Sequence, residues 1–569
     1  MHDLIIRGGR VVDGTGSPAR VADVGVSDGR ITDVGDLKGE QAKQIIEASG
    51  ALVTPGFVDI HTHYDGQATW DSRVAPSSWH GVTTVVFGNC GVGFAPVIPE
   101  HHVRLVELME GVEDIPGTAL HEGLSWEWRS FGEYLNALEA LPHDIDIAAQ
   151  VPHSALRLHV MGERGAQREP ASVQEIEAMA ALAYDGIRAG GLGFSTSRTL
   201  NHKSSRGEPI PTLTASADEL VGIARGVGAA GAGVLQVVSD FADFDAEREM
   251  YRRMVTESGR PLSLSLAQAR PGNSYRRVLD FASTMSSDGH PVRAQVAARA
   301  VGVIMGLRCT LNPFLTNRVF RTIADLGHDQ RLRALRDPAL RADILRAQLS
   351  STGRLLDRFD LMFELDENPN YEPTIDTSMA ARAAQQGQDA AEFVYDLLTS
   401  GDGETLLYVP TLNYADGNLD AAREMLAHDC SLPGLSDGGA HVGTICDGSF
   451  PTTLLALWGR DREDGLPLEY VVQRQARDTA AWVGLHDRGV LARGYRADIN
   501  VIDHDTLRLH RPEMHYDLPA GGKRLLQRAT GYLHTFVAGQ ETYRNGSPTN
   551  ALPGRLVRGP QALRGRMGS

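Results

Sequence analysis

Lysine is almost absent from this chain. Arginine supplies nearly all of the positive charge, because the 569 residues include only Lys38, Lys43, Lys203 and Lys523. Acidic residues outnumber basic ones by 72 to 55, which gives a formal net charge of −17 at pH 7. The acidic residues are spread along the chain, so they favour solubility and argue against a nucleic-acid partner.

Cysteine is equally scarce. The four cysteines, Cys90, Cys309, Cys430 and Cys446, show no Cys-x-x-Cys spacing and are too few for a disulfide framework. The chain also lacks a long apolar run, and its start, MHDLIIRGGRVVDGTG, has no basic region followed by an apolar core. We therefore expect no signal peptide, no membrane span and a cytoplasmic location.

The central part of the chain alternates between strand-like and helical patterns. Such alternation predicts βα units around a parallel barrel, here over about residues 56–485. The predicted strands are 83–89, 145–153, 192–197, 233–238, 261–268, 291–297 and 433–439. The predicted helices, 172–190 and 216–231, each begin at a serine followed three residues later by glutamate, the pattern of a capping box. At 569 residues the chain is long enough for such a barrel and a second domain.

Both ends of the chain read as short strands. Residues 1–55 contain two alternating runs around Ser27-Asp28-Gly29, a strong hairpin signal. Residues 486–569 contain similar runs, and neither segment can bury both of its faces alone. We expect the two segments to form one small β domain, although two independent β elements would show the same pattern. Residues 315–405 are mostly helical, which predicts an insertion that acts as a lid or an oligomer contact.

A pair of histidines follows the apolar run ALVTPGFVDI. Successive side chains of a strand point to opposite faces, so His61 and His63 would project into the same space. Two imidazoles at the carboxyl end of a barrel strand are a good start for a divalent metal site. The alternative is two unrelated surface histidines.

Two further residues have the chemistry of metal ligands. Asp437, in LSDGGAHVG, follows a short apolar run and could bind the metal and accept the proton of the attacking water. An ordinary Asp-Gly turn would have the same local sequence. Cys90, in VVFGNCGVGFAP, ends a predicted strand and is either a small buried hydrophobic residue or a thiolate ligand.

These motifs resemble one superfamily. PGFVDIHTHYD resembles the first barrel strand of the amidohydrolases, and the chain from Asp3 to about Gly559 resembles the N-acyl-D-amino-acid deacylases, or D-aminoacylases. The resemblance implies an α/β fold with a distorted TIM (β/α)8 barrel and a small β-sandwich built from both terminal segments. It also implies zinc, with Cys90 as a ligand and Asp437 as the eighth-strand aspartate.

The chain departs from that family at two places. D-aminoacylases carry histidines on the fifth and sixth strands, whereas the matching segments here, GVLQVVSDF and PLSLSLAQAR, have Gln236 and Gln268. The number of metal ions, one or two, therefore stays open. Many amidohydrolases instead use a carboxylated lysine, but Lys203 lies in a polar loop, which argues against that bridge and against a hydantoinase or dihydropyrimidinase.

Other residues could complete the site or bind the substrate. A histidine follows or precedes several predicted strands, and His202 is the first candidate for an extra ligand or a substrate contact. Recognition of the carboxylate of an N-acyl amino acid requires a cation, and an arginine can bind it through two parallel N–H groups. The alternative is that such an arginine forms a salt bridge within the barrel. The substrate-binding candidates are His153, Arg198, His202, Arg270, Arg299 and His441, and His290 is a further histidine near a strand.

The sequence thus predicts a metal-dependent hydrolase of a small molecule. The predicted reaction is cleavage of a linear amide in an N-acyl-D-amino acid, with zinc, with Asp437 as general base and acid, and with no membrane or nucleic-acid partner. One alternative is an amidohydrolase acting on another amide, a cyclic amide or a lactone, because a fold does not transfer its substrate. Another is a non-catalytic scaffold with this fold. A homo-oligomer is compatible with each of these hypotheses.

Overall fold

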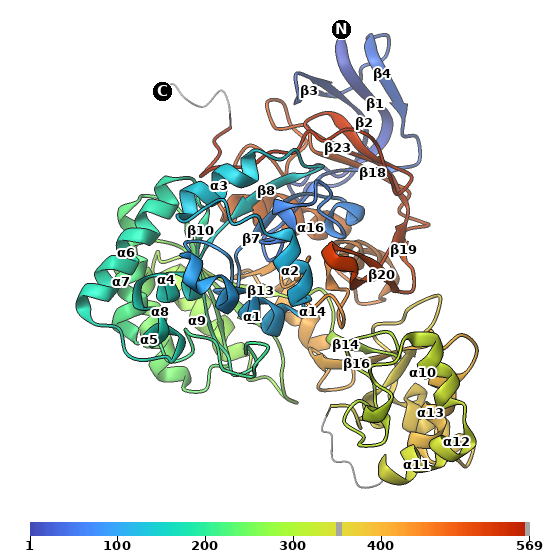
Figure 1. The fold of residues 1–569 in the computed structure, drawn as a ribbon. Helices are drawn as coiled ribbons and strands as arrows, with labels where there is room; N and C mark the ends of the chain where they lie inside the picture. The colour runs from blue at the N-terminus through green and yellow to red at the C-terminus, as the bar shows by residue number, and fades with distance from the viewer. Residues whose placement is uncertain (349–354, 564–569) are drawn as a thin grey trace.

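Strands from both ends of the chain share one sheet. The computed structural model describes residues 1–348 and 355–563. Within these residues a nine-stranded sheet has the order β25-β24-β23-β18-β5-β1-β2-β3, with β4 beside β1 (Figure 1). Its strands are β1 (His2–Val11), β2 (Arg20–Ser27), β3 (Arg30–Gly35), β4 (Ala42–Glu47), β5 (Leu52–Pro55), β18 (Ile499–Ile502), β23 (Tyr532–Val537), β24 (Gln540–Arg544) and β25 (Ser547–Pro548). The predicted turn is confirmed, since Asp28 and Gly29 have φ of 51° and 69° between β2 and β3.

Two parallel sheets form the centre of the molecule. The strands β6 (Phe57–Asp59), β7 (Val82–Phe87) and β8 (Asp146–Ala149) make one sheet. The strands β9 (Val151–Pro152), β10 (Gly193–Arg198), β11 (Val234–Ser239), β12 (Leu262–Leu266), β13 (Val292–Val296) and β17 (Ser431–Pro433) make the other. Only Gln150 separates β8 from β9, and a parallel bridge joins Thr62 to Gly438 beyond β6 and β17. The carboxyl ends of these strands consequently meet at one edge.

Six of the seven predicted strand ranges closely match observed strands. The seventh, 433–439, is wrong in its extent, because β17 ends at Pro433 and the following residues form a loop. Two glycines after Asp437 and a left-handed backbone at Leu435 and Asp437, with φ of 56° and 48°, are incompatible with a continuing strand.

Helices pack on the outside of the larger parallel sheet. They include α6 (Val173–Arg188), α7 (Ala217–Ala229), α8 (Phe244–Ser258) and α9 (Arg276–Ser287), and α6, α7 and α8 lie side by side (Figure 1). Ser172 and Glu175 form the complete capping box predicted for α6. In α7 the box is only half formed: Ser216 accepts from the N–H of Glu219, but the Glu219 carboxylate binds other side chains.

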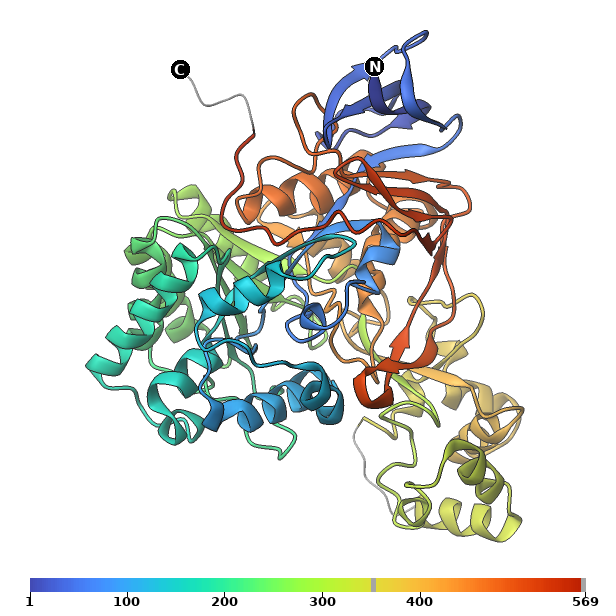
Figure 2. The same ribbon diagram turned by 45° about the horizontal axis from the view of Figure 1, so that its top comes forward.

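A helical subdomain extends from the parallel sheets. It contains the antiparallel strands β14 (Val301–Met305), β15 (Phe363–Leu365) and β16 (Leu406–Leu412) and the helices α10 (His328–Leu335), α11 (Pro338–Gln348), α12 (Met379–Gln385) and α13 (Ala390–Thr399). It has its own hydrophobic core, which includes Leu335, Met362 and Val394, and it projects from the rest in Figures 1 and 2. Residues 349–354 of the predicted insertion 315–405 lie outside the described part. The function of the insertion as a lid or oligomer contact stays a prediction.

The remaining α-helices and strands connect these parts. They are α1 (His102–Glu113), α2 (Gly117–Gly123), α3 (Phe131–Glu139), α4 (His153–Met161), α5 (Glu163–Ala166), α14 (Asp420–Ala427), α15 (Phe450–Thr453), α16 (Leu468–Gln473), α17 (Thr479–Trp482), β19 (Arg508–Leu509), β20 (Glu513–Leu518), β21 (Gly522–Leu526) and β22 (Ala529–Thr530). Across the described residues, every helix is too short or too polar to cross a bilayer.

A buried ion cluster joins the parallel sheet to the C-terminal segment. Asp146 on β8 accepts hydrogen bonds from Arg488 at 2.7 Å and from Arg496 at 2.9 Å. Burial alone would raise the pKa of Asp146, but the two guanidinium groups hold it below its usual value. The carboxylate thus stays charged and fixes two segments that are distant in sequence.

Candidate metal centre

Four of the predicted site residues lie together at the carboxyl edge of the strands. Ligand atoms of His61, His63 and Cys90 are buried and lie within 4.8 Å of one another. The Cys90 Sγ is 3.3 Å from His61 Nε2, and Asp437 Oδ1 is 3.4 Å from that nitrogen and 3.5 Å from His63 Nε2. Ligands about 2.0–2.3 Å from a tetrahedral zinc ion lie roughly 3.3–3.7 Å from one another. The spacing therefore fits a zinc site.

Backbone hydrogen bonds hold the histidine segment between its neighbours. The N–H of Thr62 donates to Val86 O, and the N–H of His63 donates to Gly438 O at 2.8 Å. The Asn89 side chain also donates to Thr62 O at 3.1 Å. The residues that follow β6 are thereby attached to the ends of both adjacent strands, which places the two imidazoles precisely.

Three residues of the site have a left-handed backbone. The φ angles of Cys90, Asp437 and His441 are 56°, 48° and 49°. Residues other than glycine seldom adopt this conformation, and its cost of order 1–3 kcal/mol is typical of functional sites. Gly91 follows Cys90 with φ of 69°, and a Cβ there would lie 2.9 Å from Thr196 Cα. The Cys90 loop therefore packs against β10 only because that position is glycine.

Both histidines direct Nε2 toward the site and Nδ1 toward an oxygen. His61 Nδ1 lies 2.5 Å from Gln295 Oε1, and His63 Nδ1 lies 3.2 Å from Glu113 Oε1. Metal-binding histidines usually have such an acceptor on the second ring nitrogen, which fixes the ring and its tautomer. The sequence analysis missed both partners. Gln295, a polar residue near the end of buried β13, was detectable, whereas Glu113 ends helix α1 and gave no signal.

The two carboxylates of the site, Glu113 and Asp437, have no lysine or arginine partner among the described residues. Burial and the neighbouring Asp437 carboxylate raise the pKa of Glu113 well above its usual value. Burial alone would also raise the pKa of Asp437, but its contact with His63 and the nearby His61 ring hold it below its usual value. Among the described residues, only histidines form ion pairs with these two carboxylates. Since uncompensated buried charge is expensive, the residues present fit a divalent cation.

Two of the predicted substrate contacts lie beside this cluster. The His441 Nε2 is 4.0 Å from Asp437 Oδ2 and 3.6 Å from Glu113 Oε2. His202 is held by a 2.8 Å contact between its Nδ1 and Ser197 Oγ. Burial, followed by the charges of His441 and His63, lowers the pKa of His202 to about 3, so it is neutral.

Two other candidates have internal partners. His153 Nδ1 lies 2.8 Å from Thr196 Oγ1, and its Nε2 lies 2.9 Å from Glu219, so both ring nitrogens have partners inside the protein. Arg299 is buried and donates to Asp447 at 3.1 Å, so it forms an internal salt bridge, the alternative to substrate binding that the sequence analysis left open.

The last two candidates are arginines at strand ends. Arg198 donates to the carbonyl oxygen of Ala215 at 2.7 Å. Arg270 is exposed beyond the end of β12.

The two glutamines in place of the family histidines have different environments. Gln236 accepts from the N–H of Cys90 at 3.1 Å and donates to Ser265 Oγ at 3.3 Å. Its amide therefore supports the Cys90 loop. Gln268 donates to Asp416 at 2.6 Å and to Gly272 O at 3.0 Å, so it stabilises a loop.

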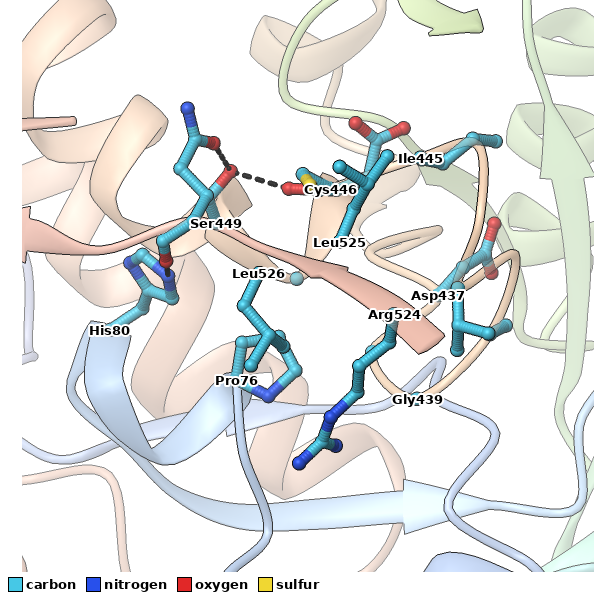
Figure 3. A pocket seen from close by; sticks show the side chains of 16 residues that line it. Pro76, His80, Asp437, Gly439, Ile445, Cys446, Ser449, Arg524, Leu525 and Leu526 are labelled. Carbon is cyan, nitrogen blue, oxygen red and sulfur yellow. Dashed lines mark hydrogen bonds between the residues drawn. The ribbon is translucent and has the colours of Figure 1, made fainter. Parts of the chain in front are cut away.

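A small, partly enclosed space has Asp437 in its lining. Pro76, Cys446, Arg524 and other residues line it (Figure 3), and its volume of about 20 Å³ leaves room for about one water molecule. This space can hold solvent beside the carboxylate, whereas an N-acyl amino acid is far larger.

The profile of the amidohydrolase family matches residues 44–543. The chain belongs to the amidohydrolase family. It is 29% identical to N-acyl-D-glutamate deacylase of Alcaligenes xylosoxydans xylosoxydans over 99% of this chain and 98% of that protein. A match to D-aminoacylase of the same organism is 34% identical but spans 40% of this chain and only 43% of that protein.

Solved structures agree with this assignment. A crystal structure of D-aminoacylase has a TM-score of 0.65 at 25% identity, over 98% of this chain and 100% of the other. N-acyl-D-glutamate deacylase from Bordetella bronchiseptica, in complex with zinc and a phosphonate mimic of the tetrahedral intermediate, has the same TM-score and identity over 98% and 99%. The predicted resemblance to D-aminoacylases is confirmed.

Proposed function

We propose that this protein is a zinc-dependent hydrolase that deacylates N-acyl-D-amino acids. One observation carries the proposal: a single carboxylate oxygen of Asp437 lies 3.4 Å and 3.5 Å from the Nε2 atoms of His61 and His63. That arrangement supports Asp437 as a proton acceptor beside the proposed metal ion. The full-length similarity to an N-acyl-D-glutamate deacylase supports the substrate class.

The same proposal includes the architecture. The parallel strands β6, β7, β8/β9, β10, β11, β12, β13 and β17, with the bridge between Thr62 and Gly438, support a distorted (β/α)8 barrel over residues 56–485. Segments 1–55 and 486–569 would form the β-sandwich, of which residues 564–569 lie outside the described part. The four cysteines are free and buried where they are described, which fits a reducing compartment such as the cytoplasm.

The residues present suit metal-assisted hydrolysis of an amide. A divalent ion held by His61, His63, Cys90 and Asp437 would polarise the acyl carbonyl and lower the pKa of water. Asp437 accepts a proton from the attacking water and delivers it to the nitrogen of the leaving amine. The C–N bond breaks, and the products are a carboxylate and a free D-amino acid.

We infer that the site holds one zinc ion. A D-aminoacylase structure is described as having a binuclear metal centre. In this chain Gln236 is already bonded to Cys90 and Ser265, and Gln268 is bonded to Asp416. The Gln236 oxygen is therefore occupied by the N–H of Cys90. The Gln268 oxygen has no hydrogen-bond partner among the described residues, but zinc prefers imidazole, thiolate and carboxylate ligands, so an amide does not replace the histidine that a second ion would need.

The carboxylate of the substrate needs a cation within reach of the site. Arg198 and Arg299 have hydrogen-bond partners inside the protein, which leaves Arg270, exposed beyond β12, as the best of the three candidates. His202 and His441 lie beside Asp437 and would contact the scissile amide or the acyl group.

Metal content and a substrate panel test the proposal. Elemental analysis should find about one zinc per wild-type chain and none in a His61→Ala, His63→Ala double variant, because both imidazoles are ligands. Zinc-loaded enzyme should hydrolyse N-acyl-D-amino acids and spare their L enantiomers. Activity restricted to cyclic amides or lactones would overturn the substrate assignment. A wild-type protein that binds no metal and cleaves none of the panel would indicate the scaffold function.

A further inference from the structure

Helix α1 ends inside the candidate metal centre. Its last residue, Glu113, is 1% exposed, although the carboxylate is among the most costly groups to bury. Asp114, which follows it, has a left-handed backbone with φ of 52° and terminates the helix. The chain therefore directs a carboxylate into the protein at the exact end of a helix.

The end of α1 is fastened to the loop that carries Asp437. The carbonyl of Glu113 accepts from the backbone N–H of His441. Asp114 accepts from the N–H of Gly443 at 3.2 Å and from Thr310 Oγ1 at 3.2 Å. These three contacts fix the position of the Glu113 side chain relative to the metal ligands.

Within the described chain, the Glu113 carboxylate forms ion pairs with two imidazoles and with no lysine or arginine. Its Oε1 is 3.2 Å from His63 Nδ1, and its Oε2 is 3.6 Å from His441 Nε2. Neither oxygen, nor His63 Nδ1, makes a hydrogen bond in aligned geometry, and all three atoms are buried. Such atoms cost free energy unless a change at the site brings them into alignment. A small rotation of the His63 ring on binding a metal through Nε2 would supply that alignment.

The partner of His61 provides a direct comparison. Gln295 Oε1 lies 2.5 Å from His61 Nδ1. The acceptor beside His61 is therefore a neutral amide oxygen, whereas the acceptor beside His63 is a carboxylate. A carboxylate is the stronger acceptor and makes the imidazole a better ligand. Metal sites typically lose about 10–100-fold in affinity when such an outer partner is removed.

We propose that Glu113 is a positioning residue that orients His63 for the metal and ties it to His441. This inference rests on the proposed function, because it assumes a metal at Nε2 of His63. Glu113 acts through His63 and contacts neither the metal nor the substrate. Its substitution should thus change metal affinity and ligand geometry, and not only turnover.

Three variants test the inference. Zinc affinity is measured by competition with a chromophoric chelator on metal-free wild type, Glu113→Ala, Glu113→Gln and Glu110→Ala. Glu113→Ala should weaken zinc binding by about 10–100-fold. Glu113→Gln should lose less, because its amide oxygen can serve His63 as Gln295 serves His61. Glu110, on the same helix, accepts from the N–H of Gly117 instead, so Glu110→Ala should bind zinc like the wild type.

A spectroscopic measurement separates positioning from a general loss of structure. Visible absorption of the Co²⁺-substituted proteins depends on coordination geometry and should change in Glu113→Ala but not in Glu110→Ala. Unchanged zinc affinity and Co²⁺ spectra in both Glu113 variants would overturn the inference and leave the proposed function intact. Wild-type protein that binds no zinc would overturn both. If Glu113→Ala fails to fold, Glu113→Gln decides: a smaller but measurable loss of zinc affinity or a changed Co²⁺ spectrum supports the inference, and wild-type values for both overturn it.

Discussion

The backbone N–H of Asp437 donates a 3.1 Å hydrogen bond to the carbonyl oxygen of His61. This bond joins the loop after β17, the last parallel strand, to the segment after β6, the first. It thereby holds the Asp437 carboxylate beside the imidazoles of His61 and His63. Ser436 strengthens the junction, because its hydroxyl donates to Asp59 at 2.5 Å and to His61 O at 3.0 Å. The loop is thus held by its backbone and by Ser436, and the Asp437 side chain remains available for chemistry.

Replacement of Asp437 by alanine should abolish turnover while the fold persists. General acid–base groups typically contribute about 10²–10⁴ in rate, and here the same carboxylate also faces the metal position. We therefore expect kcat to fall by at least that factor, with an unchanged circular dichroism spectrum. Asp429→Ala, an exposed aspartate just before β17, is the control. Near-normal activity of Asp437→Ala would remove Asp437 from the mechanism.

Zinc binding should release a proton from Cys90. Burial, with the charges of Glu113 and Asp437, raises the pKa of this thiol well above its usual value, so it is protonated at pH 7 without metal. Burial lowers the pKa of His61 and of His63, so both are already neutral and release nothing. Since zinc binds the thiolate, its affinity should rise by up to about tenfold per pH unit near neutrality.

Calorimetry in buffers of different ionisation enthalpy measures that proton. The wild type should transfer the proton of Cys90 to the buffer on zinc binding, in addition to any proton given up by Glu113, whose pKa is also raised. Cys90→Ser should release less, because a serine hydroxyl is not deprotonated on weak coordination. Equal proton release by the two proteins would show that Cys90 is not a ligand.

Replacement of His202 by alanine should leave zinc content unchanged and impair the reaction. His202 is neutral, and its contact with Ser197 fixes the ring beside Asp437, outside the group formed by His61, His63 and Cys90. Loss of such a contact should reduce kcat/KM by roughly 10–100-fold. Elemental analysis and steady-state kinetics on one preparation check both parts. Loss of zinc from His202→Ala would instead make it a ligand.

Much of the parallel core could be predicted because its strands are short, apolar and fully buried, as in β7 and β8. The strand ends also identified His61, His63, Cys90 and Asp437 as neighbours, since parallel strands place their carboxyl ends at one edge. Their catalytic and metal-binding functions stay predictions.

The remaining features depend on tertiary contacts that no local pattern encodes. Glu113 lies at a helix end, and only the packing of α1 against the His441 loop brings it to His63. Glu219 matched a capping box, yet the buried Arg157 and His153 are stronger partners for its carboxylate. The partner of Arg299 could not be inferred, because Asp447 lies in a short 3₁₀ helix beyond β17 that no local sequence pattern predicts.

Removal of the Asp146 carboxylate should destabilise the fold more than removal of an exposed ion pair. Asp146→Ala leaves the guanidinium groups of Arg488 and Arg496 buried without their shared partner, a loss of about 3–5 kcal/mol. Asp33→Ala is the control, because its 3.8 Å pair with Arg493 is exposed and worth about 0–1 kcal/mol.

The pH dependence of stability gives an independent check on Asp146. Its pKa in the folded protein lies below the unfolded value of about 3.9, so its stabilising contribution is fully present above that pH and is lost as the pH falls through the folded value. Thermal unfolding is measured between pH 3 and pH 7. At pH 7 the Tm of the wild type should lie well above that of Asp146→Ala. This difference in Tm should shrink toward pH 3, as acid neutralises the carboxylate. A difference that grows on acidification would mean that Asp146 is protonated in the native state and that Arg488 and Arg496 are neutralised by Asp487 and Asp498 instead.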